Sequence, residues 1–333
     1  MIEIIKYKNN QNLLEIEIQK GQSKMRLTNL GASLISFIFH DVDVIVGPKK
    51  IDDFIKDGYY GRTIGRTSGR LFTPGYQIKD QTYEVIPFRA NDSSLHGGKD
   101  GVSKQYFKLS SHKETADEAV VTFDLLDKEG TYPGDLTLRV VYRINRDNRL
   151  TIQFFANTTK DTLCNITNHA YFNLGEETIK THKLKMTSSA YLLTDENFHL
   201  KAVEPSKQTA FDFNDLTSIE EKLNQIKDNS FFGFDHCFYL DEKRLSLYSL
   251  QSKIGLNLTT SYPCVVIYTH NVTSPDNLAF FNTLPYKGLT LEAQYEPGGI
   301  HNKQLSNAIL EKEKTYEEFI SYQFYQGEFN ETT

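Results

Sequence analysis

Alternation of apolar and polar residues with a period of two is the feature that most constrains this chain. In the segment Leu136–Ile144, apolar residues occupy every second position, and Leu150–Ala156 repeats the pattern. Successive side chains of a β-strand point to opposite faces, so this alternation predicts strands with one buried face. Turn-forming pairs such as Pro133 and Gly134 separate these segments.

Helical periodicity is rare in the sequence. Ser218–Lys227 places apolar residues on one helical face, and one or two helical turns are expected around Leu305–Leu310. Strands and helices do not alternate regularly, which argues against a parallel, doubly wound sheet. We therefore predict an all-β fold, a large antiparallel β-sandwich with few short helices. Without a linker, repeat or low-complexity segment, residues 1–333 are expected to form a single domain.

Charge and cysteine content narrow the functional classes. The net charge of −6 comes from intermixed acidic and basic residues, so no basic cluster indicates a nucleic-acid partner. No apolar run is long enough to span a bilayer, and the charged N-terminal segment lacks the apolar core of a signal peptide. Cys164, Cys237 and Cys264 lie far apart, which favours reduced thiols in a cytoplasmic protein and offers no metal-ligand spacing.

Two predicted strands carry polar groups on one face. In Cys164–Asn173, alternation places His169 and Tyr171 on the same face, together with Thr167 and Asn173. Such a face is a plausible wall for a polar ligand, although a histidine in a strand also serves as an ordinary structural hydrogen-bonding group. In Leu289–Glu296, Glu292 stands between apolar neighbours. Partial burial there would raise its pKa and favour a general base, whereas solvation at a sheet edge is the alternative.

Two further segments contain candidate residues. Gly233–Leu240 has two faces of similar apolarity, so it is expected to be covered on both sides, and Asp235 would then need partners. His96 precedes Gly97 and Gly98, which permit a tight turn and a close backbone approach, or simply an ordinary surface turn. The arginine-rich segment Tyr60–Arg70 lacks the spacing of a phosphate-binding loop.

Six short motifs follow one another in a characteristic order. They are Arg66, Leu95–Gly98 (LHGG), Asp127–Leu136 (DKEGTYPGDL), Thr167–Leu174 (TNHAYFNL), Gly233–His236 (GFDH) and Leu291–Gln294 (LEAQ). This series resembles the galactose mutarotase (aldose 1-epimerase) family, over nearly the whole chain from about residue 25 to the region of Phe324. The resemblance implies a large β-sandwich with an open carbohydrate cleft.

The resemblance also implies roles for five residues. Glu292 matches the family's catalytic base, His169 its catalytic acid, and His96 a second histidine near the ring oxygen and the anomeric centre. Asp235 and Arg66 match residues that hold sugar hydroxyls. The implied reaction interconverts the α and β anomers of a free aldose of the glucose or galactose type. It requires neither a cofactor nor a metal, and its partner is a monosaccharide. We expect a monomer or a homodimer.

The sequence departs from the family pattern at four places. The family's Asn-Arg-Ile block is matched to Gly65–Thr67, and a family tryptophan appears as Phe107. A glutamine that contacts sugar in the family is Val266 here, and a Pro-Asp pair is replaced by Pro297 and Gly298. These departures leave the acid–base pair intact but alter its surroundings. We therefore predict that the preferred sugar is not simply galactose.

Two alternatives share the predicted fold. A hexose-6-phosphate epimerase would need basic residues for the phosphate, and Arg62, Arg70 and Lys104 are near the motifs in sequence. A non-catalytic carbohydrate-binding protein would keep the cleft without its chemistry. A glycoside hydrolase fits less well, because it needs a flanking pair of carboxylates whereas the motifs supply Glu and His.

Overall fold

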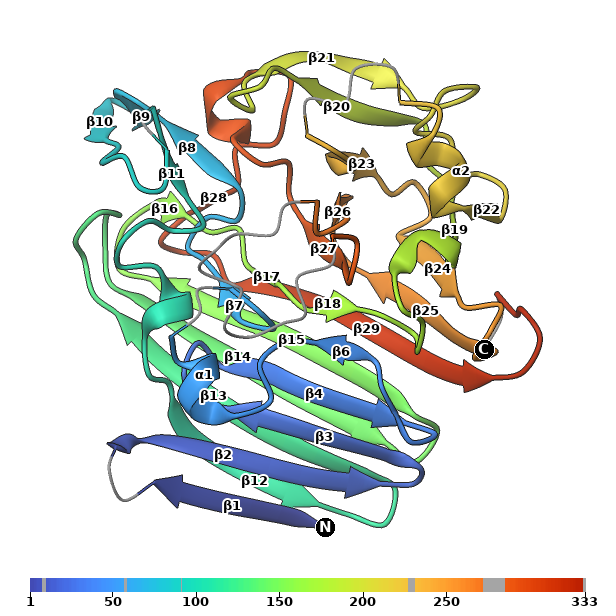
Figure 1. Cartoon of the computed structure of the whole chain (residues 1–333). Helices are drawn as coiled ribbons and strands as arrows, with labels where there is room; N and C mark the ends of the chain where they lie inside the picture. The colour runs from blue at the N-terminus through green and yellow to red at the C-terminus, as the bar shows by residue number, and fades with distance from the viewer. Residues whose placement is uncertain (8–9, 57–58, 91, 227–230, 272–284, 332–333) are drawn as a thin grey trace.

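The fold is built from antiparallel β-sheets. The computed structural model describes residues 1–333 except 8–9, 57–58, 91, 227–230, 272–284 and 332–333. Among the described residues, no helix is long and apolar enough to cross a membrane. Figure 1 shows two short helices, α1 (Ile51–Phe54) and α2 (Ile219–Leu223), at the periphery of the sheets.

A nine-stranded sheet forms one layer. In spatial order its strands are β12 (Lys108–Glu114), β13 (Glu118–Asp127), β14 (Leu136–Asn145), β15 (Arg149–Thr158), β29 (Tyr316–Gln326), β25 (Ile254–Thr260), β24 (Arg244–Tyr248), β19 (Lys183–Met186) and β22 (Thr217–Ser218). β14 and β15 confirm the two strands predicted from alternation. They pair with Tyr142 opposite Ile152, so the apolar positions of both strands lie on one face.

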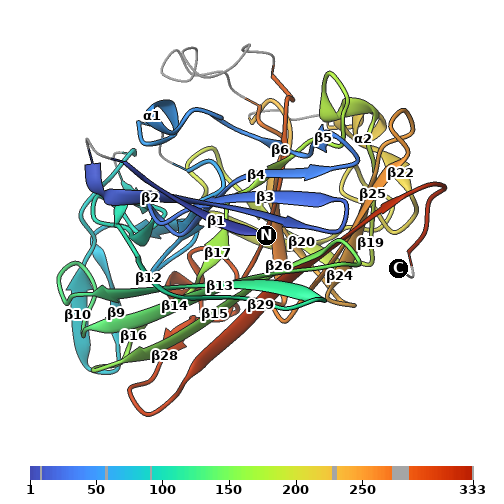
Figure 2. The ribbon, with the colours of Figure 1, turned by 90° about the horizontal axis from the view of Figure 1, so that it is seen from below.

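Two smaller sheets form the facing layer. The five-stranded sheet contains β1 (Ile2–Tyr7), β2 (Asn10–Lys20), β3 (Ser23–Thr28), β4 (Ser33–Phe39) and β5 (Val42–Asp43). The seven-stranded sheet contains, in spatial order, β21 (Leu200–Pro205), β20 (Ala190–Thr194), β23 (Asp235–Tyr239), β26 (Cys264–Tyr268), β27 (Leu289–Gln294), β18 (Tyr171–Phe172) and β6 (Ile45–Val46). Figure 2 shows β2–β4 stacked over β13–β15, as expected for a β-sandwich.

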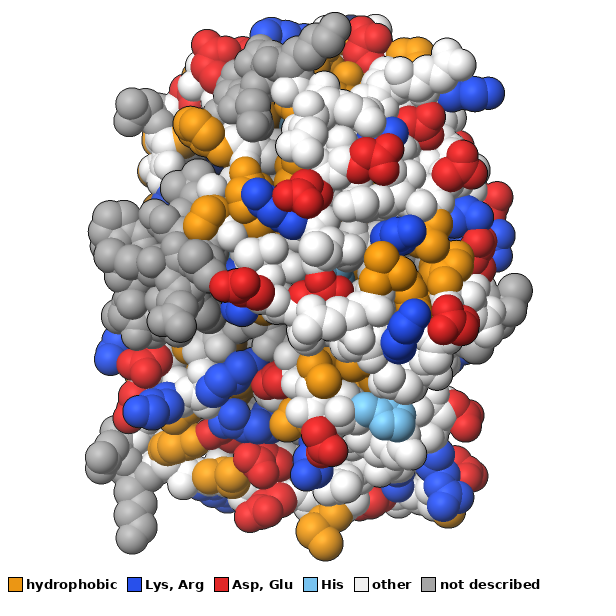
Figure 3. All heavy atoms as spheres, turned by 45° about the vertical axis from the view of Figure 1, so that its right-hand side comes forward, with side chains coloured by type: hydrophobic (Ala, Val, Ile, Leu, Met, Phe, Trp, Pro, Cys, Tyr) orange, Lys and Arg blue, Asp and Glu red, His pale blue; other side chains and the backbone are white. Residues whose placement is uncertain are grey.

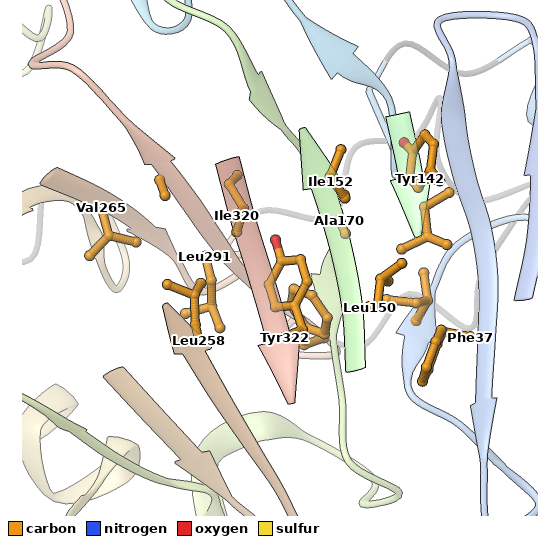
Figure 4. Close-up of a cluster of buried hydrophobic side chains, with 14 of the residues drawn as sticks. Phe37, Tyr142, Leu150, Ile152, Ala170, Leu258, Val265, Leu291, Ile320 and Tyr322 are labelled. Carbon is orange, nitrogen blue, oxygen red and sulfur yellow. The ribbon is translucent and has the colours of Figure 1, made fainter. Parts of the chain in front are cut away.

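The hydrophobic core lies between these layers. One continuous cluster of buried side chains draws on all three sheets. Figure 4 shows Phe37 of β4 near Leu150 of β15, and Leu291 of β27 near Ile320 of β29. Inward-facing side chains of opposed sheets interdigitate in this way because each strand presents every second residue to the partner layer. The predicted all-β sandwich with few short helices is confirmed.

Short strand pairs and 3₁₀ turns complete the fold. The pairs are β7 (Thr63–Ile64) with β17 (Thr167–Asn168), β8 (Arg70–Phe72) with β11 (Ser93–Leu95), β9 (Gly75–Ile78) with β10 (Gln81–Glu84), and β16 (Thr162–Leu163) with β28 (Ile309–Leu310). Within the part of the chain that the structure describes, the 3₁₀ turns are Val102–Lys104, Ile179–Thr181 and Gly299–His301.

Three local predictions need correction. The helix expected over Ser218–Lys227 spans Ile219–Leu223, and Lys227 lies outside the described residues. The helical turn expected around Leu305–Leu310 is wrong, because Ile309 and Leu310 pair with β16 as strand β28. The single strand expected over Cys164–Asn173 is interrupted at His169, because the backbone of His169 bonds instead to Gly61 and Arg62.

Candidate active site

A cleft of about 600 Å³ lies on the face of the seven-stranded sheet that is turned away from the core. β23, β26 and β27 supply its floor, together with the segment that precedes β18. β8, the end of β11, the β20–β21 hairpin and the segment Pro297–Leu305 supply its walls. These strands lie in the upper half of the molecule in Figure 1. The walls matter because they remove polar groups on the floor from water.

Strand register sets one row of side chains across the floor. Glu292 of β27 is opposite Val266 of β26, and Val266 is opposite Cys237 of β23. On the other side of Glu292 stands His169, two residues before the Tyr171–Thr290 pair. Directly opposed residues in antiparallel strands point to the same face, so the four side chains form the row His169, Glu292, Val266, Cys237.

Glu292 and His169 are adjacent and buried. His169 Nε2 lies 3.5 Å from Glu292 Oε1, and the two residues are 5% and 3% exposed respectively. Burial raises the pKa of Glu292 to about 8, and the hydroxyl of Thr290, which donates to Oε1 at 3.1 Å, opposes this shift. The pair therefore places a strongly basic carboxylate beside an imidazole in a site of limited solvent access.

His96 completes a cluster of three titratable groups. Its ring is nearly perpendicular to that of His169, with the ring centroids 5.2 Å apart. The backbone N–H of Gly69 donates to His96 Nδ1 at 3.2 Å, so the proton of the neutral ring sits on Nε2. Burial lowers the pKa of His96 well below its ordinary value, and neighbouring His169 lowers it further. His96 is therefore a neutral hydrogen-bond donor at neutral pH.

The same three residues have the donor types of a zinc site. The candidate ligand atoms of His96, His169 and Glu292 lie within 4.8 Å of one another. A histidine that ligates a metal through one nitrogen donates a hydrogen bond through the other. The Nδ1 of His96 instead accepts a hydrogen bond from Gly69, which leaves Nε2 protonated and without a lone pair for a metal. The arrangement therefore fits proton transfer better than metal binding.

A charged pair lines the same cleft as this cluster. Arg70 of β8 and Asp235 of β23 both line the cleft, and the Arg70 guanidinium lies 3.5 Å from the ring centre of Phe198. Burial raises the pKa of Asp235 to about 7, which the positive charge of Arg70 opposes and the charge of Glu292 reinforces. Burial also lowers the pKa of Arg70, an effect that Asp235 opposes. This pair can hold sugar hydroxyls through charge-assisted hydrogen bonds.

Arg66, expected to bind a hydroxyl, lies elsewhere. It does not line the cleft and is 1% exposed. Its Nε donates to Asp127 at 2.6 Å, and its terminal nitrogens donate to backbone carbonyls that include those of Pro133 and Gly134. Arg66 thus connects its own segment to the Asp127–Leu136 motif. All its N–H donors are bonded inside the protein, so no donor is left for a ligand.

The family's Asn-Arg-Ile block therefore corresponds better to Gly69–Leu71 than to Gly65–Thr67. Arg70 is followed by the aliphatic Leu71, as the family arginine is followed by isoleucine, whereas Arg66 is followed by a threonine. The aliphatic residue after Arg70 is therefore the feature of the sequence that could have identified Arg70 as the matching arginine. The other matched positions, His96, His169, Asp235 and Glu292, all line one cleft.

Comparison with known proteins agrees with this geometry. A family model described as aldose 1-epimerase matches residues 15–323. The chain belongs to the aldose 1-epimerase family. It is 30% identical to the aldose 1-epimerase of Escherichia coli K12 over 80% of each chain. It is 29% identical to the galactose mutarotase of Mus musculus, covering 85% of this chain and 84% of that one. The chain is accordingly an isomerase.

A solved structure shows the same fold for another family member. The galactose 1-epimerase of Lactobacillus acidophilus NCFM superposes with a TM-score of 0.89 and 27% identity. The superposition covers 98% of this chain and 99% of that chain. The sandwich and the strands that carry the cleft residues are therefore those of a galactose mutarotase-like fold.

In this family member, the basic residues considered for a phosphate are mostly unavailable to the cleft. Arg62 is buried and donates to the carbonyls of Phe54 and Ser103. Lys104 donates to the carbonyls of Gly98 and Lys99. Neither lines the cleft, whereas Arg70 does.

Several cleft residues had no signal in the sequence. Arg89, exposed beside the ring of Tyr59, lines the cleft, and so do Leu192, Leu200 and Leu305 from its walls. In the sequence these residues look like ordinary hydrophobic or loop residues, so nothing marks them as part of a site. Only the tertiary arrangement of the β20–β21 hairpin and the Pro297–Leu305 segment brings the three leucines to the floor residues.

Proposed function

We propose that this family member interconverts the α and β anomers of a free aldose, with Glu292 as general base and His169 as general acid. The observation that carries the proposal is the buried contact of 3.5 Å between His169 Nε2 and Glu292 Oε1 on the cleft floor. A base and an acid at this separation can reach two oxygen atoms on the same carbon, which is what opening a cyclic hemiacetal requires.

Ring opening transfers two protons and breaks one carbon–oxygen bond. The Glu292 carboxylate takes the proton of the anomeric hydroxyl, and the electrons of that O–H bond form the carbonyl at C1. The bond between C1 and the ring oxygen breaks, and that oxygen receives a proton from the His169 imidazolium. The product is an open-chain aldehyde with protonated Glu292 and neutral His169, so the pair keeps its single mobile proton.

Ring closure reverses these roles. After rotation about C1–C2 the former ring hydroxyl attacks the opposite face of the carbonyl. His169 accepts the hydroxyl proton while Glu292 returns its proton to the new anomeric oxygen. The enzyme is thereby reset without any cofactor, as expected when acid and base exchange roles.

The remaining polar residues would position the sugar. The neutral His96 donates through Nε2, which suits a contact near the ring oxygen and the anomeric centre. Arg70 and Asp235 offer donors and acceptors for hydroxyls on the other side of the ring. Arg70 takes the place that the sequence assigned to Arg66.

Polarimetry tests the proposal. Freshly dissolved α-D-glucose or α-D-galactose should approach equilibrium faster with the protein than in buffer, and Glu292→Gln should lower the catalysed rate by roughly 10²–10⁴-fold. His169→Asn should do the same. If the wild type gave no acceleration but still bound sugar, the protein would be a carbohydrate-binding protein and the proposed reaction would be wrong.

The preferred sugar is a finer proposal. We propose that it is not simply galactose, because the apolar Val266 stands next to Glu292 on the cleft floor. A panel of glucose, galactose, maltose and a hexose 6-phosphate tests this, and a strong galactose preference would contradict it. Arg70 and Arg89 are the cleft residues that could favour the phosphorylated sugar.

We also propose that the protein acts in the cytoplasm as a monomer or a homodimer. The free, buried state of all three cysteines supports a reducing compartment.

A further inference from the structure

The floor of the cleft changes from polar to apolar at Val266. On one side of Glu292 stands His169, and on the other stand Val266 and then Cys237, in a row fixed by strand register. Val266, Cys237 and Cys264 belong to a small hydrophobic cluster separate from the main core. An apolar surface therefore begins one strand spacing, about 5 Å, from the general base.

This apolar surface continues up the wall of the cleft. Leu192 and Leu200 from the β20–β21 hairpin and Leu305 from the segment after β27 join the same cluster. All three line the cleft, as do Val266 and Cys237. We call these five residues the apolar subsite. All five line the cleft of about 600 Å³, and none of them is an Asp, Glu, Lys, Arg or His residue.

The order of the row indicates which part of the sugar meets this subsite. This step rests on the proposed function, in which His169 protonates the ring oxygen and Glu292 contacts the hydroxyl on C1. The anomeric carbon has two ring neighbours, the ring oxygen and C2. With the ring oxygen toward His169, C2 and its substituent point to the other side of Glu292, toward Val266. An aglycone does not fit there, because a free anomeric hydroxyl is required for the reaction.

One polar atom beside the subsite lacks a partner. Gln294 follows Glu292 by two residues on the same face of β27, lines the cleft and is 1% exposed. Its Oε1 is buried without a hydrogen-bond partner among the described residues, while its Nε2 donates to the carbonyl of Tyr295. Buried polar atoms are rarely left unsatisfied, so this unpaired acceptor in a residue that lines the cleft points to a hydrogen-bond donor on the ligand.

We propose that this cleft is built for aldoses that carry an acylamino group at C2, such as N-acetylhexosamines. The amide N–H at C2 donates to Gln294 Oε1, and the acyl methyl fills the apolar subsite. A hydroxyl at C2 supplies the donor but leaves the apolar subsite filled with water. A hydrogen at C2 supplies neither the donor nor the apolar group. Only the acylamino group satisfies both features of the site.

The test compares three substituents at C2 on otherwise identical rings. Catalysed anomerisation is measured for glucose, 2-deoxyglucose and N-acetylglucosamine, and each rate is corrected for the uncatalysed rate of the same sugar. The same three substituents are compared on galactose. The second series ensures that a preference for one configuration at C4 does not obscure the effect of the C2 substituent. The wild type should show a kcat/KM about tenfold or more higher for the N-acetyl sugar than for its parent hexose in at least one series. The proposal is overturned if, in both series, kcat/KM for the parent hexose equals or exceeds kcat/KM for its N-acetyl derivative.

A variant at the centre of the subsite sharpens the test. Val266→Gln should lower kcat/KM for the N-acetyl sugar and raise it for the parent hexose, which reverses the ratio by about tenfold. Val203→Gln, the same change at an exposed position of β21 outside the cleft, should leave the ratio unchanged. A Val266→Gln protein that folds, by circular dichroism, yet changes all substrates by one common factor overturns the assignment of the subsite.

The experiments distinguish between two outcomes: the protein does not catalyse anomerisation, or the apolar subsite does not bind the C2 acylamino group. If no sugar is anomerised faster than in buffer, the proposed function falls. Isothermal titration then still tests the subsite directly: tighter binding of N-acetylglucosamine or N-acetylgalactosamine than of the parent hexose supports it. Equal or weaker binding of both overturns it.

Discussion

Glu292 is a carboxyl group that the fold holds almost completely out of water. Its pKa rises from 4.5 to about 8, mainly because of burial. A carboxyl group whose pKa is raised in the folded state binds its proton more tightly there than in the unfolded chain. Ionisation of Glu292 therefore lowers the free energy of unfolding progressively as the pH rises from about 4.5. The whole of this loss of stability is present above about pH 8. Such a cost is expected where activity requires it, here for the general base that we propose.

Glu292→Gln should therefore stabilise the protein while abolishing its proposed activity. The uncharged amide removes the cost of ionising a buried carboxyl, so we expect the free energy of unfolding at pH 9 to rise by roughly 2 kcal/mol. The gain should shrink toward pH 4, where Glu292 is protonated in the folded protein. Urea denaturation across this pH range measures the effect.

The control for this experiment is Glu313→Gln at an exposed position. It should change the free energy of unfolding by less than about 0.5 kcal/mol at either pH. A gain at Glu292→Gln that is the same at pH 4 and pH 9 would argue against a buried, ionisable carboxyl group as its cause.

Substitutions at Arg66 and Arg70 should have different effects, one on stability and the other on activity. Arg70→Ala should lower kcat/KM for the sugar by about 10-fold or more, because a charge-assisted contact is lost, while the thermal midpoint changes little. Arg66→Ala should lower the free energy of unfolding by about 3 kcal/mol or more, because it removes the cation that pairs with Asp127 and the donor to the carbonyls of Pro133 and Gly134.

Steady-state kinetics and chemical denaturation of both variants separate the two roles. Arg62→Ala provides a second buried arginine that bonds to carbonyls, and it should behave like Arg66→Ala. A stable Arg66→Ala protein with a selective loss of sugar affinity would restore the expectation drawn from the sequence.

At the scale of elements, β27 determines where the reactive groups lie. It is paired on both sides, with β26 and β18, and all six of its residues are buried. Leu289, Leu291 and Ala293 belong to the core cluster, while Thr290, Glu292 and Gln294 are the alternate residues that face away from it. A central strand with a packed inner face holds its outer side chains in fixed positions, which suits proton transfer over short distances.

The turn after β11 has a similar function for His96. Gly97 follows His96 with φ +83°, and a Cβ at that position would overlap the carbonyl oxygen of Gly65. Gly97→Ala should therefore lower the free energy of unfolding by roughly 1–3 kcal/mol and reduce kcat/KM, because the displaced turn moves His96.

Gly130→Ala is the control for this turn. Among the described residues, and apart from its two chain neighbours, the nearest atom to a Cβ added at Gly130 is the carbonyl oxygen of Lys128 at 4.0 Å, and φ of Gly130 is not in the left-handed region. It should leave activity and stability nearly unchanged. Thermal melts and polarimetry measure both variants, and a Gly97→Ala protein with wild-type activity would contradict the positioning role of the turn.

At the scale of the whole molecule, three sheets share one core. The main cluster includes Phe37 from the five-stranded sheet, Leu291 from the seven-stranded sheet and Tyr322 from the nine-stranded sheet. Neither smaller sheet could unfold without exposing the apolar face of the large one. We therefore propose that residues 1–333 form one cooperative domain. Figure 3 shows acidic and basic side chains intermixed on one face of this molecule, in keeping with its small net charge.

One cooperative domain should give one unfolding transition. Loss of far-ultraviolet circular dichroism and loss of tyrosine fluorescence should coincide in urea, because Tyr residues occur throughout the chain and no Trp biases the signal. Two separated transitions would show instead that the five-stranded or the seven-stranded sheet unfolds independently.

The sequence by itself determined several of the strands, the side of its strand on which Glu292 lies, and the family. A strand presents alternate residues to alternate faces, so the parity of Glu292 relative to Leu291 can be read from the sequence. His169 also reaches the expected face, although its strand is interrupted: it stands two residues before Tyr171, which pairs with Thr290, and its ring lies beside Glu292. The ordered motifs indicated the aldose 1-epimerase family, to which the chain belongs.

Only the tertiary structure decided which arginine faces the cleft and how deeply Glu292 is buried. The segment that contains Arg66 and Arg70 is mostly irregular, so no periodicity assigns its side chains to a face. The apolar subsite brings together Leu192 and Leu305, which the sequence separates by more than a hundred residues. Such contacts depend on how sheets and hairpins pack against one another, and a local pattern carries no information about that packing.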